Sequence, residues 1–272
     1  IKKIHNRKFI FVIEKDQKKI VGISGIKAKT GIERPFFSFI IHDKVKYPYL
    51  ELAKENYGPS EIGSLFLCPE HRNKGIGRLL SLSRFLYIKS YPELFTSTII
   101  AELRGYLYKN NVSPVWNALG KKFIQMSFNK ADIESIKDLS FIPNNFPKKP
   151  IYLQLLPKDT INYFKKVHPF TEPAKKLLLS ENFKITNHID IFDGGPKLES
   201  NVNNIRSIKN AIKVPFNKIE DYINPKFNYL VSNCSDTNFN CTKITRKTNI
   251  KGVRKLLNIN LNDHILLVKE RE

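Results

Sequence analysis

The sequence has no uninterrupted run of about 18 apolar residues, the length that a membrane-spanning helix needs. Its first residues, IKKIHNRKFIFV, also lack the long apolar core and the small-residue cleavage site of a secretory signal peptide. We therefore expect a soluble, cytoplasmic protein without a membrane partner. The chain begins at Ile1, close to a strand-like segment and without an initiator Met, so we expect that an N-terminal part is missing.

Cysteine is scarce, and its spacing argues against a structural metal. Cys68, Cys234 and Cys241 are an odd number in a chain of this length, and no CxxC pair offers a zinc site. Cys234 and Cys241 also have no histidine partners at metal-ligand spacing. We expect reduced thiols and no metal.

Clusters of positive charge are missing as well, although 46 Lys and Arg stand against 25 Asp and Glu and give a formal net charge of +21. Such a charge would indicate nucleic acid or an anionic membrane surface if the cations were gathered together. The lysines are instead scattered among Ile and Asn residues, which is typical of a solvated surface. We expect no nucleic-acid partner, and a small acidic ligand such as a nucleotide is compatible with this charge.

What the sequence does contain is an α/β pattern, with 272 residues and 41% hydrophobic content, enough for one large or two modest cores. Residues 8–28 predict a β-hairpin, and residues 30–60 read as loops. The strand EIGSLFLCP, a Gly-rich turn and the helix GRLLSLSRFLYIKSY follow, and residues 97–107 look like another buried strand. This order builds an α/β layer rather than a helical bundle.

The second half of the chain predicts a further α/β unit and a β-rich end. A helix is expected over residues 113–127, with Pro114 in its first turn, and a strand in KITNHIDIF that ends at the turn DGGP. Short β-rich pieces follow after about residue 205. The expected parts are residues 1–145 with the Gly-rich turn, residues 146–205 with the second α/β unit, and residues 206–272 as a small β-rich subdomain.

The Gly-rich turn HRNKGIGRLL places Arg72, Gly75 and Gly77 between a strand and a helix. Glycines at this position let backbone amides approach a pyrophosphate at the positive end of the helix. The turn lacks the GK[ST] ending of a P-loop and the third glycine of a dinucleotide fingerprint. A tight turn at a helix N-terminus is the alternative. The pattern that remains resembles the acyl-CoA loop of the GNAT superfamily: Arg or Gln, two residues, Gly, any residue, Gly or Ala.

Several longer segments resemble the arginine N-succinyltransferase family. In chain order they are SLFL with LLSLSRF, AELRG, SPVWNALGKKFIQMSFNKAD, PIY, VHPFTEPA and IDIFDGGPKLE, from about residue 61 to 206. The resemblance implies an α/β GNAT-like acyl-CoA N-acyltransferase fold with two such units and an added β-rich part. It implies transfer of the succinyl group of succinyl-CoA, a co-substrate rather than a bound cofactor, to the α-amino group of L-arginine in arginine catabolism. It is also compatible with an oligomer.

The same resemblance assigns roles to residues. His168 in VHPF matches the family's proton donor, which suits an imidazole with an ordinary pKa of about 6.5, and a loop or capping residue is the alternative. The strand at Leu65 is where the family binds succinyl-CoA through backbone amides, and an ordinary core leucine is the other interpretation. The loop residues expected at the pyrophosphate are Arg72, Lys74, Gly75, Gly77 and Arg78.

Four charged residues are candidates for substrate binding. Glu102 and Arg104 in AELRG lie two apart on a predicted strand and so share a face. Arg104 would receive a carboxylate of the succinyl group or of arginine, and Glu102 would help with a cation, while an internal Glu–Arg ion pair is the alternative. Asp190 and Asp193 in IDIFDGGP would face the guanidinium of arginine, although an Asp before Gly-Gly is also typical of a plain turn.

We therefore expect an arginine N-succinyltransferase in which the amine attacks directly, because no Cys or Ser lies in a nucleophile motif. The enzymatic alternatives are ornithine as the acceptor, or another GNAT N-acetyltransferase with acetyl-CoA as the donor. From another class, the alternative is a basic nucleic-acid-binding protein on a degenerate GNAT scaffold, which would show steeply salt-dependent binding.

Overall fold

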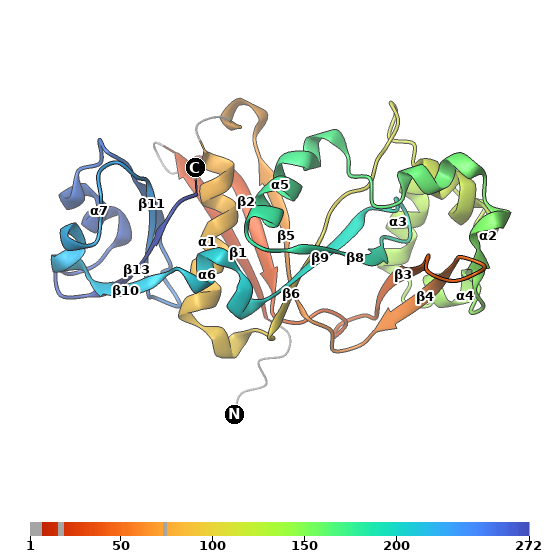
Figure 1. The fold of residues 1–272 in the computed structure, drawn as a ribbon, viewed down its shortest axis with the longest axis horizontal. Coiled ribbons are helices and arrows are strands. Elements are labelled where there is room, and N and C mark those ends of the chain that lie inside the picture. Colours follow the sequence, from red (N-terminus) through yellow and green to blue (C-terminus); the bar gives the residue numbers. More distant parts are fainter. Residues whose placement is uncertain (1–6, 16–18, 73–74, 272) are drawn as a thin grey trace. The chain divides into compact units, whose positions relative to one another are not determined.

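The computed structural model describes residues 7–15, 19–72 and 75–271, and it divides into two compact units (Figure 1). Unit 1 comprises residues 1–28, 62–97 and 201–272, and unit 2 comprises residues 29–61 and 98–200. Each unit draws on segments that are distant in the sequence. The three consecutive parts 1–145, 146–205 and 206–272 expected from the sequence stay a prediction.

Unit 1 contains the hairpin and the strand–turn–helix order that the sequence predicts. β1 (Lys8–Lys15) and β2 (Lys19–Lys27) pair antiparallel, and β5 (Ser60–Leu67) lies next to β2. Helix α1 (Ile76–Ser90) packs on the hairpin through Tyr87, whose ring centroid lies 5.1 Å from that of Phe9. Its apolar positions become buried as the helical spacing predicts: Leu80, Leu82, Phe85 and Leu86.

Arg84 ties α1 to the neighbouring strand β5 of unit 1. Its side chain is buried, and Nη1 donates to the Gly63 carbonyl oxygen at 3.2 Å while Nη2 donates to Ser81 Oγ at 2.8 Å. Burial lowers the pKa of Arg84 to about 10. The middle of α1 is therefore tied to β5.

The C-terminal part of unit 1 has its own sheet, with the antiparallel strand order β10-β13-β11-β12, shown in blue in Figure 1. Helix α7 supplies Val253 and Leu257 to a core that also holds Val214, Val231 and Leu267. The elements are α6 (Arg206–Lys209), β10 (Ile212–Pro215), β11 (Tyr229–Asn233), β12 (Cys241–Ile244), α7 (Ile250–Leu257) and β13 (His264–Lys269).

Unit 2 is built on a mixed sheet with the order β5-β6-β9-β8-β3-β4-β7, to which β5 contributes its first residues. Residues 30–60, expected to be loops, in fact hold two antiparallel strands of this sheet. The strands are β3 (Phe36–His42), β4 (Tyr49–Glu55), β6 (Thr98–Glu102), β7 (Ile151–Tyr152), β8 (Lys184–Ile189) and β9 (Pro196–Asn201).

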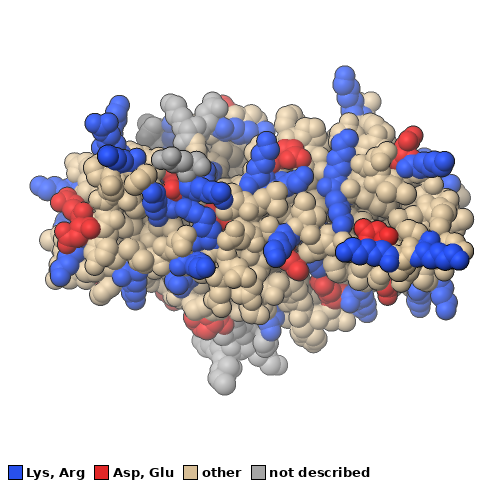
Figure 2. Space-filling view, in the orientation of Figure 1, with Lys and Arg blue, Asp and Glu red and all other residues tan. Residues whose placement is uncertain are grey.

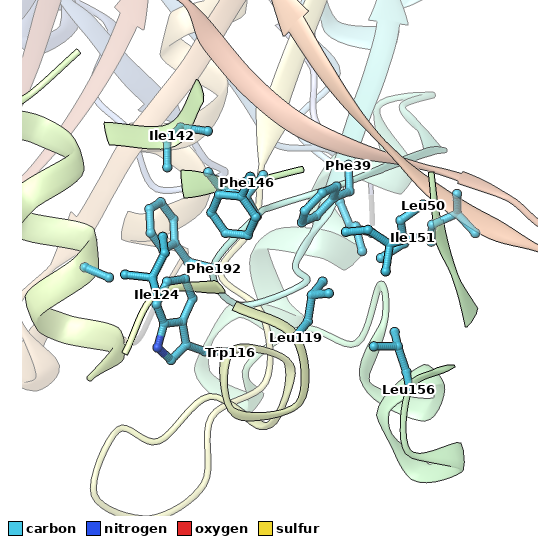
Figure 3. Close-up of a cluster of buried hydrophobic side chains, with 14 of the residues drawn as sticks. Phe39, Leu50, Trp116, Leu119, Ile124, Ile142, Phe146, Ile151, Leu156 and Phe192 are labelled. Carbon is cyan, nitrogen blue, oxygen red and sulfur yellow. The ribbon is translucent and has the colours of Figure 1, made fainter. Parts of the chain in front are cut away.

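Short helices cover one face of this sheet around an aromatic core (Figure 3). Trp116 is fully buried, and its ring stacks on Phe192 with centroids 5.4 Å apart. The helix expected over 113–127 ends at Phe123, and its central turn Trp116–Gly120 is π-helical, with Gly120 directly against the Trp116 ring. The other helices are α2 (Lys121–Phe123), α3 (Phe128–Lys137), α4 (Phe141–Asn145) and α5 (Glu172–Ser180).

The described residues include no helix with both the length and the apolar character needed to cross a membrane. They also include no group of three or more His, Cys, Asp or Glu side chains placed to hold a metal ion. On the face shown in Figure 2, Lys and Arg side chains are spread among acidic and uncharged residues. On that face the charge is scattered, as the sequence pattern predicts.

Candidate active site

His168 lies against the chain that follows β6. The His168 amide donates to the Arg104 carbonyl oxygen at 2.9 Å, and the Tyr106 amide donates to the Lys166 carbonyl oxygen at 2.9 Å. These two bonds form a short antiparallel pairing in which Arg104 is opposite His168 and Tyr106 is opposite Lys166. Cross-strand neighbours of this kind share one face, so the four side chains leave the pairing on the same side.

The opposite face of this pairing is packed too tightly for larger residues. Gly105 and Val167 form the bridge between the two segments, and both are buried. A β-carbon on Gly105 would lie 2.6 Å from Asp193 Oδ1 and 2.7 Å from the Gly195 nitrogen. The motifs AELRG and DGGP therefore meet backbone to backbone, which requires glycine.

His168 uses one ring nitrogen within the fold and leaves the other available. Its Nδ1 accepts a hydrogen bond from the Phe170 amide at 3.2 Å and caps the 3₁₀ turn Pro169–Thr171. A neutral imidazole that accepts at Nδ1 carries its proton on Nε2. Within the part of the chain that the structure describes, Nε2 has no hydrogen-bond partner. The capping interaction therefore leaves the Nε2–H of the neutral ring available to a ligand, and the proton-donor role stays a prediction.

Three carboxyl groups with raised pKa values belong to the same unit. Burial raises the pKa of Glu102 well above its usual range, and the charge of Asp190 raises it further. Glu102 Oε1 is buried without a hydrogen-bond partner among the residues described. Burial, followed by repulsion from Asp193, raises the pKa of Asp190 to about 8, and burial also raises that of Asp193. A cation bound near these groups would favour their ionised forms.

Asp190 and Asp193 also build the turn that precedes β9. Asp190 Oδ1 accepts hydrogen bonds from the amides of Phe192 and Asp193, each at 2.8 Å, and Asp193 Oδ1 accepts one from Gly195 at 2.8 Å. Gly194 has φ +70°, in the left-handed region. The turn interpretation is thus realised in the geometry, and a guanidinium contact stays a prediction.

Arg104 has an exposed guanidinium on the face that carries His168. Strand β6 ends at Glu102, so the predicted strand over 97–107 is shorter than expected and Arg104 lies beyond its end. The structure has no ion pair between Arg104 and Glu102, two described residues, and the buried Oε1 of Glu102 contrasts with the exposed Arg104. The charge of Arg104 acts on Asp132 and Asp193, whose pKa values it lowers against the larger effect of burial. Its guanidinium is exposed, and its role in receiving a carboxylate stays a prediction.

The predicted acyl-CoA loop lies in unit 1. Gly75 is the N-cap of α1 with φ +77°, a conformation that favours glycine. A β-carbon on Gly77 would meet only Leu67 Cδ2, at an ordinary 3.7 Å, so packing does not require glycine there. Arg72 Nε donates to the Leu67 carbonyl oxygen at 3.0 Å, and Arg78 Nε is buried without a hydrogen-bond partner among the residues described. Lys74 lies outside the described residues.

Leu65 lies in the second half of β5 and is not a core residue. Ser64, just before it, has φ +52°, and the side chains of Leu65 and Phe66 are 37% and 51% exposed. The parallel register of β5 with β6 comprises two pairs, Ser60 with Ile99 and Glu61 with Ile100. The core interpretation of Leu65 therefore fails, and the backbone role stays a prediction.

Comparison with known proteins identifies the family. The model described as "Arginine N-succinyltransferase beta subunit" matches residues 1–207. Arginine N-succinyltransferase of Yersinia pseudotuberculosis serotype O:3 (strain YPIII) is 35% identical over 243 residues, which cover 83% of this chain and 69% of that protein. The chain belongs to the arginine N-succinyltransferase family.

Two further relatives agree with this family. Arginine N-succinyltransferase of Escherichia coli O17:K52:H18 (strain UMN026 / ExPEC) is 35% identical over 215 residues, 75% of this chain and 62% of that protein. The solved structure of arginine/ornithine succinyltransferase subunit AI from Pseudomonas aeruginosa matches with a TM-score of 0.83 and 26% identity, over 97% of this chain and 82% of that one. The family and the mixed α/β acyl-CoA N-acyltransferase fold predicted from the sequence are confirmed.

Within this family member, sequence reasoning missed the aromatic residues beside His168. Tyr106 and Tyr163 have ring centroids 5.3 Å apart, and Lys166 Nζ lies 4.5 Å from the Tyr106 ring centroid. The available signal was the placement of Tyr106 and Tyr108 two and four residues after Arg104, which an extended chain puts on one face. Tyr163 and Lys166 meet them through long-range pairing, for which the sequence offers no local pattern.

Proposed function

We propose that this chain transfers the succinyl group of succinyl-CoA to the α-amino group of L-arginine. Membership in the arginine N-succinyltransferase family, over residues 1–207, is the observation that carries the proposal. The pairing of His168 with Arg104 on one exposed face supports it, because the reaction needs a proton donor and a group that holds a carboxylate.

In the proposed reaction, the neutral α-amine attacks the thioester carbonyl carbon and forms a tetrahedral intermediate. The carbon–sulfur bond then breaks, the electron pair leaves with the sulfur, and His168, as the imidazolium, donates its Nε2 proton to the departing thiolate. The neutral ring then takes up the proton that the attacking amine loses and is an imidazolium again. The imidazolium also carries a proton on Nδ1, so the hydrogen bond from the Phe170 amide belongs to the neutral ring.

For the acceptor, the proposal places side chains of opposite charge at the two charged ends of arginine. Arg104 binds a carboxylate, and the carboxyl groups of Glu102, Asp190 and Asp193 face the guanidinium. The raised pKa values support this assignment, since a bound guanidinium would stabilise ionised carboxylates that burial otherwise disfavours. Asp190 and Asp193 keep their turn bonds in this arrangement, because each accepts them at Oδ1.

The proposal places the binding site of the acyl donor at the Gly-rich turn and β5. Backbone at Leu65 would contact the acyl-CoA arm, and the pyrophosphate would lie at the start of α1. Arg72, Gly75, Gly77 and Arg78 would bind it together with Lys74, which lies outside the described residues. Two observations support this: Gly77 is a glycine that packing does not require, and Arg78 Nε has no partner among the residues described.

Ornithine is a second candidate acceptor, because the solved neighbour is a subunit of an arginine/ornithine succinyltransferase. That neighbour is a subunit and the matching family is described as a beta subunit, which supports the proposal that this chain works in an oligomer.

The test is release of free CoA thiol from succinyl-CoA or acetyl-CoA, with arginine, ornithine or lysine as the acceptor. Wild type is compared with His168→Ala and with a control, His264→Ala, which alters an exposed histidine of β13. We expect arginine-dependent turnover of succinyl-CoA that falls about 100-fold or more in His168→Ala alone, the usual range for loss of a general acid. No turnover by wild type with any pair would refute the proposal, and full activity of His168→Ala would refute the role of His168.

A further inference from the structure

Lys166 is held over two tyrosine rings. Its Nζ lies 4.5 Å from the centroid of Tyr106 and 5.1 Å from that of Tyr163, distances at which a cation is attracted to a ring face. Tyr108 completes a cluster: its hydroxyl donates to the Tyr163 hydroxyl at 2.7 Å, and its ring is edge-on to Tyr106 at 5.7 Å. We call Tyr106, Tyr108 and Tyr163 the tyrosine cluster.

The positive charge of Lys166 has no acidic partner in the described part of the chain. Among the residues that the structure describes, no carboxylate lies within 4 Å of its Nζ, and the residue is exposed. The rings restrict the side chain, so little rotamer entropy remains to be lost when its ammonium binds an anion. Lys166 is thus a cation that the fold has already oriented.

The turn before Lys166 separates it from its neighbour Lys165. Lys165 has φ +61°, a conformation that side chains other than glycine rarely adopt. Its amide donates to the Gly194 carbonyl oxygen, and its Nζ donates to Asn187 Oδ1, both at 2.9 Å. Two consecutive lysines therefore have different partners, and only Lys166 lies over the rings.

The position of Lys166 connects it to the proposed reaction. It is two residues before His168 on the paired segment, and so it lies on the same face, about 7 Å along the chain. Arg104 is directly opposite His168 in this pairing. The imidazole is therefore accompanied by two cations from two segments. The proposed reaction brings two carboxylates to this place, the terminal carboxylate of the succinyl group and the α-carboxylate of arginine.

We propose that Lys166, oriented by the tyrosine cluster, binds a substrate carboxylate next to His168 and so selects for substrates that carry one. This inference rests on the proposed function. A carboxylate is the ligand because an ammonium with three N–H donors forms strong charge-assisted bonds with it. The succinyl carboxylate and the α-carboxylate share this chemistry, and substrates that lack one or the other distinguish them.

The experiment compares matched substrates in wild type, Lys166→Met and Lys166→Arg. Butyryl-CoA has the length of succinyl-CoA without its terminal carboxylate, and agmatine is arginine without its α-carboxylate. Lys165→Met is the control, since it removes the neighbouring positive charge, whose Nζ donates to Asn187 Oδ1. In Lys166→Met we expect kcat/KM to fall about 10- to 100-fold for the substrate whose carboxylate is bound, and far less for its analogue. Lys166→Arg should retain most of the preference.

Each outcome decides the inference. A fall for succinyl-CoA but not for butyryl-CoA identifies the succinyl carboxylate, and a fall for arginine but not for agmatine identifies the α-carboxylate. Equal losses for all substrates, or none, would overturn the proposal. The tyrosine cluster adds a second test: Tyr163→Phe keeps the ring and should keep the preference, whereas Tyr163→Leu should weaken it.

Calorimetric binding of the same four compounds separates this inference from the proposed function. A wild-type chain that turns over no pair refutes the proposed function. The binding measurements then still test the role of Lys166. Loss of carboxylate-dependent affinity in Lys166→Met supports the inference, and unchanged affinities for all four compounds refute it.

Discussion

Gly105 and Asp193 lie so close together that a β-carbon on Gly105 would overlap the Asp193 backbone and side-chain oxygens. This contact joins the end of β6 to the turn before β9 and fixes the segment that pairs with His168. Gly105→Ala should therefore lower the free energy of unfolding by about 3 kcal/mol or more, because backbone atoms cannot move aside as a flexible side chain would. Urea unfolding followed by circular dichroism measures this change.

A matched control for Gly105→Ala is available in α7. A β-carbon on Gly252 would meet nothing within 4 Å, so Gly252→Ala should stabilise the chain by about 0.5–1 kcal/mol through helix propensity. Equal stability of Gly105→Ala and wild type would show that this contact does not hold the two motifs together.

The parts of the fold that the sequence predicted correctly are those with local patterns. The hairpin over 8–28 and the helix after the Gly-rich turn follow from alternation and helical spacing within single segments. The strands β3 and β4 were missed because Pro35 directly precedes β3 and Pro48 directly precedes β4. Prolines at such positions suggest loops. Periodicity therefore predicted elements well where no breaker interrupted the segment.

The candidate site could be predicted only in part, for a related reason. His168 and Arg104 were found through family motifs, but their pairing depends on hydrogen bonds between residues 60 and 64 positions apart. The position of Lys166 over the tyrosine cluster depends on the left-handed conformation of Lys165. A lysine in the sequence does not indicate that conformation. Long-range backbone geometry, rather than residue type, decides which side chains meet here.

Asp190 leads to a prediction about pH. Burial and repulsion from Asp193 raise its pKa in the folded chain to about 8, from an ordinary value of 3.8. Between these values the folded state binds more protons than the unfolded state, so the free energy of unfolding should fall as pH rises. Asp190→Asn should reduce this fall, and its amide oxygen can still accept the hydrogen bonds from Phe192 and Asp193.

The measurement is urea unfolding at several pH values from about 5 to about 8, in wild type, Asp190→Asn and a control. Asp159→Asn serves as the control, because Asp159 is an exposed carboxyl on a 3₁₀ turn of the same unit. The control should keep the pH dependence of wild type. The prediction is wrong if Asp190→Asn and Asp159→Asn show the same slope, or if the stability of wild type increases over this range.

Gly77 tests whether the Gly-rich turn binds the acyl donor. A β-carbon there meets only Leu67 Cδ2 at 3.7 Å, so Gly77→Ala should leave the melting temperature unchanged or slightly raised. If backbone amides at the start of α1 contact the pyrophosphate, the added methyl group should hold the phosphates away and raise KM for succinyl-CoA roughly tenfold or more, with little change in KM for arginine.

Gly75→Ala supplies the contrast to this variant. Gly75 has φ +77°, so an alanine there should destabilise the chain by about 1–2 kcal/mol whether or not a ligand binds. Steady-state kinetics and thermal unfolding of the two variants together separate a binding role from a folding role. An unchanged KM for succinyl-CoA in a stable Gly77→Ala variant would remove this turn from the donor site, because the glycine would then serve neither packing nor phosphate.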